Sequence, residues 1–160
     1  MINRFILAIS LVCLVACDAR ENTGLPDDKG IGSIVGMNYT GNGIQQFTVD
    51  GKWGGNVGSY GGRGTVCCAV YPKKWTPDLK VTVKWERSDG REPDGKEWKL
   101  IWLEKIVPIP KYLEEGEVNV LFLADDQVAN YISNLGVADP NFPGKPGYPK
   151  NPNKMRSTTP

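Results

Sequence analysis

The chain has 160 residues and a nearly balanced charge, with 19 basic and 18 acidic residues and a formal net charge of +1 at pH 7. This balance gives no indication of a nucleic-acid partner. The sequence contains no histidine, which removes the commonest general base and the commonest zinc ligand and argues against most hydrolases. It also lacks a Gly-x-Ser-x-Gly elbow and a Cys–His pair. We therefore predict a protein that is not an enzyme and that has no catalytic residue, metal or cofactor.

Residues 1–16 have the pattern of a signal peptide. Arg4 precedes the apolar run Phe5–Ala16, which has the length of a signal-peptide hydrophobic region and falls short of the roughly 20 residues of a membrane-spanning helix. The run ends in Leu14-Val15-Ala16-Cys17, the pattern that lipoprotein signal peptidase cleaves. We therefore predict cleavage before Cys17 and a lipid anchor on that cysteine. The alternative is an ordinary buried N-terminal helix with a core cysteine.

The predicted anchor also predicts a location. An acylated cysteine carries several hydrocarbon chains such as palmitate, and each buried methylene contributes about 0.8 kcal/mol to membrane binding. Asp18, directly after the anchor, resembles the signal that retains enterobacterial lipoproteins on the inner membrane. We expect the protein on the periplasmic face of a Gram-negative membrane, with the inner membrane favoured.

The rest of the chain divides into three parts. Residues 17–31 are polar and turn-rich, as expected of a lipidated tether. Residues 138–160 are rich in proline and glycine, and we predict a flexible tail that builds no core. Residues 32–137 remain as one β domain with one modest core.

Within this domain the hydrophobic pattern is mostly that of strands. Leu79, Val81, Val83 and Trp85 alternate with polar residues, which predicts a half-buried strand. Two further segments, residues 98–107 and 118–124, are partly apolar on both faces, which predicts central strands covered on two sides. The fold class is therefore mainly β, a small antiparallel sheet or sandwich of about six strands with at most one short helix. The strands are expected at 32–40, 45–50, 65–71, 79–86, 98–107 and 118–124, and residues 125–134 are the segment that could form the one short helix.

The segment Gly51–Gly64 has seven glycines in fourteen positions. A phosphate-binding loop is excluded because the Walker spacing and the strand-to-helix context are missing. We expect a long, mobile connection, whose glycines permit positive φ angles. A loop that contacts a partner and a loop that only connects strands are equally compatible with this composition.

Cys67 and Cys68 are adjacent in a strand pattern, where successive side chains point to opposite faces. A disulfide between them requires a distorted turn. Two readings stay open: two buried core thiols, or one strained vicinal disulfide. A metal site is disfavoured because two thiolates without histidine supply too few ligands. Trp85, Trp98 and Trp102 occupy strand positions and are read as core residues.

An ordered series of motifs resembles a family of Gram-negative lipoproteins, the domain-of-unknown-function family numbered 3304. The similarity covers about residues 34–86, and beyond Trp85 the sequence shares only the general character of the family. The motifs are Gly36-Met-Asn-Tyr-Thr40, Phe47-Thr-Val-Asp-Gly51, Trp53-Gly-Gly-Asn56, Gly61-Gly-Arg-Gly64, Cys67-Cys68, Pro72 to Trp75-x-Pro77 and Val81-x-Val-x-Trp85.

The resemblance implies a function. Similar lipoproteins occur beside phospholipase effectors of the type VI secretion system and serve there as immunity proteins. We therefore expect this chain to bind and inhibit a phospholipase effector at the membrane, through Trp53, Asn56, Tyr60 and Arg63 of the glycine-rich segment. The alternative is an envelope ligand-binding module or enzyme that uses the adjacent cysteines or exposed tryptophans.

Overall fold

The structure is a computed structural model, and it describes residues 24–91, 95, 97–144 and 147–152. The predicted signal peptide, the anchor Cys17 and the first part of the tether lie outside the described residues. So does the C-terminal end of the predicted tail.

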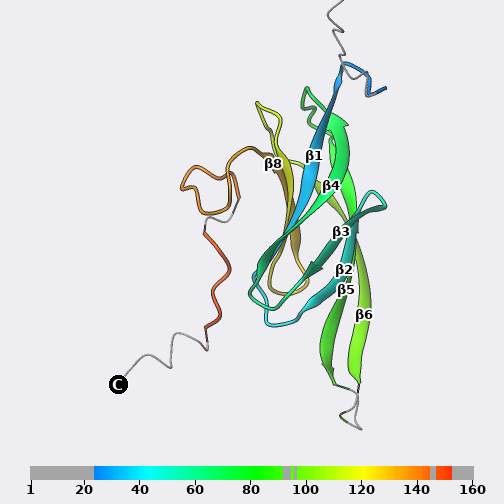
Figure 1. Ribbon diagram of the computed structural model, residues 1–160, viewed down its shortest axis with the longest axis vertical. Coiled ribbons are helices and arrows are strands. Elements are labelled where there is room, and N and C mark those ends of the chain that lie inside the picture. The colour runs from blue at the N-terminus through cyan, green and yellow to red at the C-terminus, as the bar shows by residue number, and fades with distance from the viewer. Residues whose placement is uncertain (1–23, 92–94, 96, 145–146, 153–160) are drawn as a thin grey trace, which may run out of the picture.

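Eight strands form two four-stranded sheets that pack face to face (Figure 1). The first sheet has the order β4-β1-β7-β8 and the second the order β3-β2-β5-β6. The mainly β class is confirmed, with two more strands than the six expected from the sequence. The strands are β1 (Lys29–Asn38), β2 (Ile44–Val49), β3 (Lys52–Val57), β4 (Gly62–Pro72), β5 (Lys80–Arg91), β6 (Trp98–Pro108), β7 (Glu117–Phe122) and β8 (Val128–Ser133).

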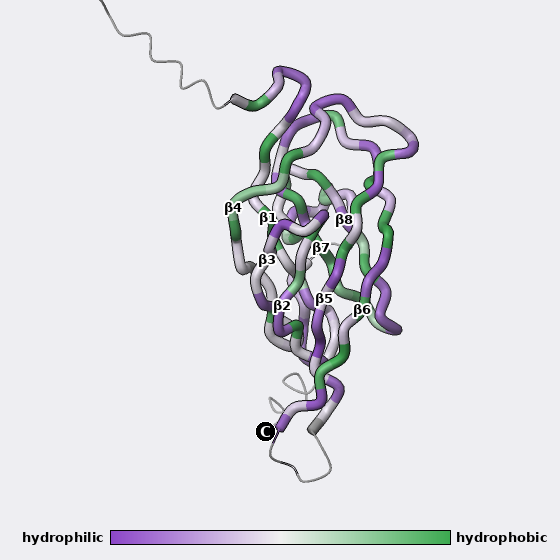
Figure 2. The backbone as a smooth tube through the Cα atoms, turned by 90° about the vertical axis from the view of Figure 1, so that its right-hand side faces the viewer, coloured by the Kyte–Doolittle hydropathy of each residue, from purple (hydrophilic) through white to green (hydrophobic). Residues whose placement is uncertain are grey.

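The main core fills the space between the two sheets. On β5, Val83 and Trp85 are buried in it while Lys84 between them is exposed, so the predicted alternation of this strand is confirmed. Figure 2 shows such changes between hydrophobic and hydrophilic residues along the strands. Phe47 on β2 and Phe122 on β7 meet edge to face across the core, with ring centroids 5.2 Å apart. Aromatic pairs in this geometry stabilise a core beyond the area they bury.

β7 is a central strand, as its apolar sequence predicted. It pairs in parallel with β1 and antiparallel with β8. Val120 faces the main core, whereas Leu121 belongs to a second cluster on the outer face of the same sheet. Both faces of β7 are therefore covered.

Residues 125–134, the segment that the sequence allowed as the one short helix, form a turn and a strand instead. Asp125 and Asp126 have φ angles of 56° and 54°, so they form a tight left-handed turn instead of a helix N-cap. Aspartate tolerates this region because its short side chain bonds locally. The chain then returns as β8, with Asn130 facing the main core and Tyr131 the outer cluster.

The segment after β8 covers the outer face of the first sheet. Val137 and Phe142 are buried against Val35, Met37 and Leu121. The hydroxyl of Tyr39 donates a hydrogen bond to the carbonyl of Gly147 at 2.8 Å. The prediction that residues from 138 onward build no core is therefore wrong for Phe142, because the chain folds back and its aromatic ring finds an apolar sheet face.

Candidate functional site

The outer face of the second sheet carries large apolar side chains that no described segment covers. Its three tryptophans are between 48% and 57% exposed, and Ile106 is 65% exposed. The residues lie on the two edge strands of the sheet, β3 and β6. We call this surface the aromatic face; it consists of Trp53, Trp98, Leu100, Trp102 and Ile106.

Polar residues fill the middle of the aromatic face. Thr48 on β2 lies opposite Trp53 on one side and Lys84 on the other. The ammonium of Lys84 sits 5.2 Å from the ring centroid of Trp102, a cation–π contact that occupies one side of this ring. Gln46 donates a hydrogen bond to the carboxylate of Glu86 at 2.9 Å. The surface thus combines exposed aromatic edges with an ordered polar centre.

The assignment of Trp98 and Trp102 to the core is wrong, whereas that of Trp85, which is 2% exposed, is confirmed. The expectation that residues 98–107 form a central strand covered on two sides is also wrong, because β6 is an edge strand. Glu104 could have indicated that this face of the strand is exposed. It lies two positions after Trp102, so both side chains are on the same face of β6. A carboxylate is almost never fully buried without a partner.

The long glycine-rich loop expected at 51–64 is wrong, because β3 and the start of β4 occupy most of it. Gly54 is required by packing, since a Cβ atom there would lie 2.2 Å from the ring of Phe47. Gly36 on β1 packs against the same ring. Only residues 58–61 connect the two strands.

The four predicted partner-contacting residues do not form one loop tip. Trp53 belongs to the aromatic face, and Asn56 is exposed further along β3. Tyr60 is half-buried in the short connection, where its amide donates a hydrogen bond to the carbonyl of Thr40 at 2.9 Å. Arg63 lies on β4, and its side chain is outside what the structure describes.

Several motif residues behind the family resemblance build the fold. The buried amide of Asn38 donates hydrogen bonds to the carbonyls of Asn42 and Gly58, at 2.7 and 3.1 Å. Its oxygen accepts from the backbone and hydroxyl of Thr40. Asn38 thereby fixes the connections on either side of β2 and β3.

Cys67 and Cys68 are joined by a disulfide, with a cis peptide bond between them. The reading as two buried thiols is therefore wrong, and Cys67 is exposed. The bridge lies on β4, in the sheet that does not carry the aromatic face. Among the residues that the structure describes, no group of three or more potential metal ligands occurs.

Arg87 joins the two sheets at one end of the sandwich. Its guanidinium binds both carboxylate oxygens of Asp126, at 2.6 and 3.0 Å, and Asp89 at 2.7 Å. The hydrogen bond from Arg87 lowers the pKa of Asp89, and the bond to Asp126 raises the pKa of Arg87. Asp126 lies in the turn between β7 and β8, so its ion pair with Arg87 holds this turn against β5.

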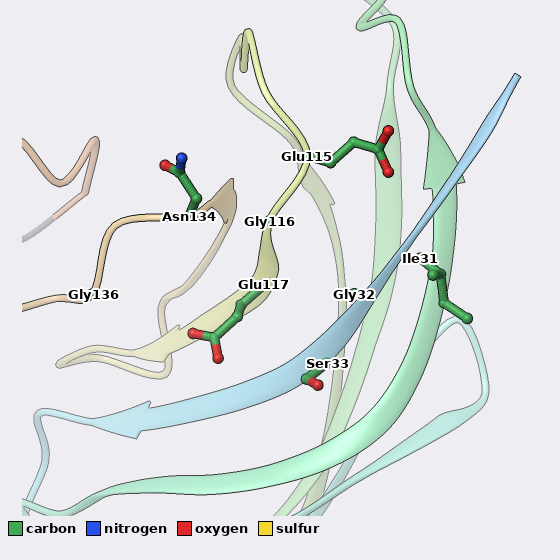
Figure 3. Close-up of a pocket in the computed structure, with 8 residues that line it drawn as sticks. All are labelled: Ile31, Gly32, Ser33, Glu115, Gly116, Glu117, Asn134 and Gly136. Atoms are coloured by element: carbon green, nitrogen blue, oxygen red, sulfur yellow. The ribbon is translucent and has the colours of Figure 1, made fainter.

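An open groove of about 540 Å³ lies between the start of β1 and the segment that leads into β7 (Figure 3). Glu115 and Glu117 point to opposite sides of this segment in Figure 3. Glu115 forms an ion pair with Lys73 at 3.5 Å, and Asn134 donates a hydrogen bond to Glu114 at 2.7 Å. The polar groups of the groove therefore diverge instead of converging on one ligand.

No curated protein and no solved structure matches the chain. Among the described residues, no helix has the length and apolar composition of a membrane span. The family model described as "Protein of unknown function (DUF3304)" matches residues 37–129, which is more than half of the 160 residues. The chain belongs to this family.

Proposed function

We propose that the protein is a membrane-anchored immunity lipoprotein of the periplasm that binds and inhibits a phospholipase effector of the type VI secretion system. The observation that carries the proposal is the aromatic face, where three tryptophans stay half-exposed on a regular sheet. Tryptophan is enriched in the energetically dominant centres of protein interfaces. On β6 the exposed apolar side chains follow one another along one strand, and exposed apolar patches of this kind mark binding surfaces.

The chemistry of the partner supports this assignment. A phospholipase must admit the acyl chains of its substrate, so the rim of its active site is apolar. The aromatic face offers a complementary apolar surface, with Lys84 and Glu86 available for polar contacts in its centre. Covering the rim blocks the entry of lipid without any chemical step, and a rigid sheet loses little conformational entropy on binding.

The proposal keeps the four contact residues predicted from the sequence, but it gives them different roles. Trp53 becomes a main contact at one edge of the aromatic face, and Trp98 and Trp102 are main contacts at the opposite edge. Asn56 and Arg63 remain proposed at the margin of the interface, since β3 and β4 pack beside one another. Half-buried Tyr60 contributes by holding the connection between them.

A binding experiment tests the proposed interface. The candidate partners are phospholipase effectors of the type VI secretion system encoded in the same genome, and titration calorimetry measures the dissociation constant of each for the full chain carrying Cys17→Ser. We expect Trp53→Ala to raise this constant at least about 30-fold, the loss expected at a dominant interface residue. Leu113→Ala is the matched control, because Leu113 is 85% exposed and lies outside the aromatic face. Equal binding by both variants would exclude the aromatic face as the interface.

The proposed anchor has its own test. Mass spectrometry of the membrane fraction should find the wild-type mature chain beginning at an acylated Cys17. Cys17→Ser should leave an unlipidated precursor, because serine lacks the thiol that the acyl transferase modifies. Unchanged acylation of this variant would exclude Cys17 as the anchor.

A ligand-binding module of the envelope is the second candidate, and the same exposed tryptophans favour it. They would stack on sugar rings, although Lys84 already covers one side of Trp102. Quenching of tryptophan fluorescence by envelope glycans, lost in Trp53→Ala, would favour this candidate over the immunity function. An enzyme that uses the cysteines is less compatible, since the disulfide leaves no thiolate to act as nucleophile.

A further inference from the structure

The edge strands of the two sheets differ in how well they would accept another strand. β3 and β8 have only 6 residues each, and the ladder between β4 and β1 contains two register shifts. β6 has 11 residues, and it pairs with β5 without a shift from Lys80↔Pro108 to Ser88↔Leu100. Figure 1 shows β6 at the outer margin of its sheet. Along an edge strand, the backbone groups of every second residue point away from the sheet and can pair with another chain.

We infer that β6 pairs with β6 of a second copy of this chain, in an antiparallel two-fold symmetric dimer. The two four-stranded sheets would then form one continuous sheet across the dimer axis. Such isologous contacts are the commonest way in which soluble chains form dimers. This inference goes beyond the proposed immunity function and does not depend on it.

The charges along β6 select the register of this pairing. Pairing centred on Trp102 would place Lys99 opposite Lys105 of the second copy, and pairing centred on Glu104 would place two copies of Glu104 opposite one another. Like charges directly opposite in a ladder are destabilising. A centre at Leu103 avoids both conflicts, and because Leu103 is the midpoint of β6 this register pairs the whole strand.

The same register brings complementary side chains together. On the aromatic face, Leu100 lies opposite Ile106 of the second copy, and both are exposed in the single chain, at 45% and 65%. At the ends, Trp98 lies opposite Pro108 of the second copy. Apolar pairs of this kind stabilise a ladder beyond its backbone hydrogen bonds. Two-fold symmetry makes each of these contacts occur twice.

Analytical ultracentrifugation of the full chain carrying Cys17→Ser, over a range of concentrations, tests the inference. We expect a dimer that dissociates on dilution. Leu100→Lys should raise the dissociation constant at least tenfold, because it places a charge opposite Ile106 at two symmetric positions. The double variant Leu100→Lys with Ile106→Glu should recover dimerisation, since the new charges then lie opposite one another only in the register centred on Leu103.

Two controls separate pairing from misfolding. Far-ultraviolet circular dichroism checks that each variant keeps its strands, and Val70→Lys places the same charge on the outer face of the other sheet, where Val70 is 49% exposed. This control should leave the dimer unchanged. A wild-type chain that is monomeric at all concentrations, a Leu100→Lys variant that still dimerises, or a double variant that stays monomeric would each overturn the inference. Loss of effector binding in Trp53→Ala with an intact dimer would leave both proposals in place, since Trp53 lies on the opposite edge strand.

Discussion

Both sheets of the sandwich carry large apolar side chains on their outer faces, but the two faces differ in how far these side chains are covered. On the first sheet Val35, Met37 and Leu121 are at most 3% exposed, because Val137 and Phe142 pack over them. On the second sheet the apolar side chains of β6 remain about half-exposed. The strand sequences alone do not produce this difference. It arises because a segment from the end of the chain reaches one face and not the other.

This comparison bears on which face the proposed partner would bind. An apolar sheet face that the chain covers with its own segment contributes to the stability of the free protein. Large apolar side chains that stay exposed on a sheet face cost stability or solubility unless binding compensates for them. The contrast between the faces therefore supports placing the interaction surface on the second sheet.

Among changes to the covering segment, removing the ring of Phe142 should have the largest effect on stability. Phe142 is 4% exposed and meets Tyr131 edge to face, with centroids 5.6 Å apart. Phe142→Ala should lower the free energy of unfolding by about 3 kcal/mol, from lost burial and the cavity left behind. Urea denaturation measures this change. A loss below about 0.5 kcal/mol, the range of ordinary surface substitutions, would show that the segment does not cover the face in solution.

The covering segment is also packed too closely to accept a methyl group. A Cβ atom at Gly144 would lie 2.6 Å from the ring of Tyr131 and 2.8 Å from that of Phe142. Gly144→Ala should therefore cost about 1–2 kcal/mol, the usual penalty of overpacking. Gly58→Ala is the matched control, because a Cβ at Gly58 would meet nothing within 4 Å. Equal denaturation midpoints for the two variants would contradict the close contact.

The hydroxyl of Tyr39 makes the cover sensitive to alkaline pH. Burial raises the pKa of Tyr39 above its ordinary value of about 10. The folded state therefore holds its proton where the unfolded state loses it, so this stabilisation is complete below about pH 10 and is lost as pH rises through the folded-state pKa. A phenolate can no longer donate to the carbonyl of Gly147.

Tyr39→Phe tests this contribution. At neutral pH the variant should lose about 1 kcal/mol, the net value of one hydrogen bond. Its stability should then fall less steeply than that of the wild type above about pH 10. Tyr71 and Tyr112, whose pKa values are also raised by burial, should retain part of the alkaline dependence. Parallel pH profiles for variant and wild type would contradict the role of Tyr39.

The sequence predicted those parts of the fold that depend on local pattern. The alternation around Val83 placed β5 with the correct buried side, and the two apolar faces of β7 indicated a central strand. β3 was missed because its glycines resemble a loop, whereas Gly54 is there to let the strand approach Phe47. β8 was missed because the two aspartates before it favour a helix N-cap as readily as a left-handed turn.

The candidate site was predicted only in part because exposure is a non-local property. Trp85 and Trp102 both occupy strands and have the same propensity, yet one faces the opposite sheet and the other faces outward. Trp53 was singled out from its neighbourhood in the glycine-rich segment. Nothing in the order of residues shows that the cover over the first sheet stops short of the second. The covering segment lies far along the chain from the strands that it buries.

The smallest change in stability is expected on the uncovered face. It tests most directly whether the outer face of the second sheet is exposed in the free chain. Trp102 is 48% exposed, so removing its ring leaves no core cavity and forfeits mainly the contact with Lys84. At a concentration where the chain is monomeric, Trp102→Ala should change the free energy of unfolding by no more than about 1 kcal/mol, the value of an exposed cation–π contact. Trp85→Ala, at a tryptophan that is 2% exposed on the neighbouring strand, should lose about 3–5 kcal/mol. Urea denaturation of both variants measures the difference. If Trp102→Ala lost as much as Trp85→Ala, its ring would be buried in the free chain, and the second sheet would be covered in solution as the first one is.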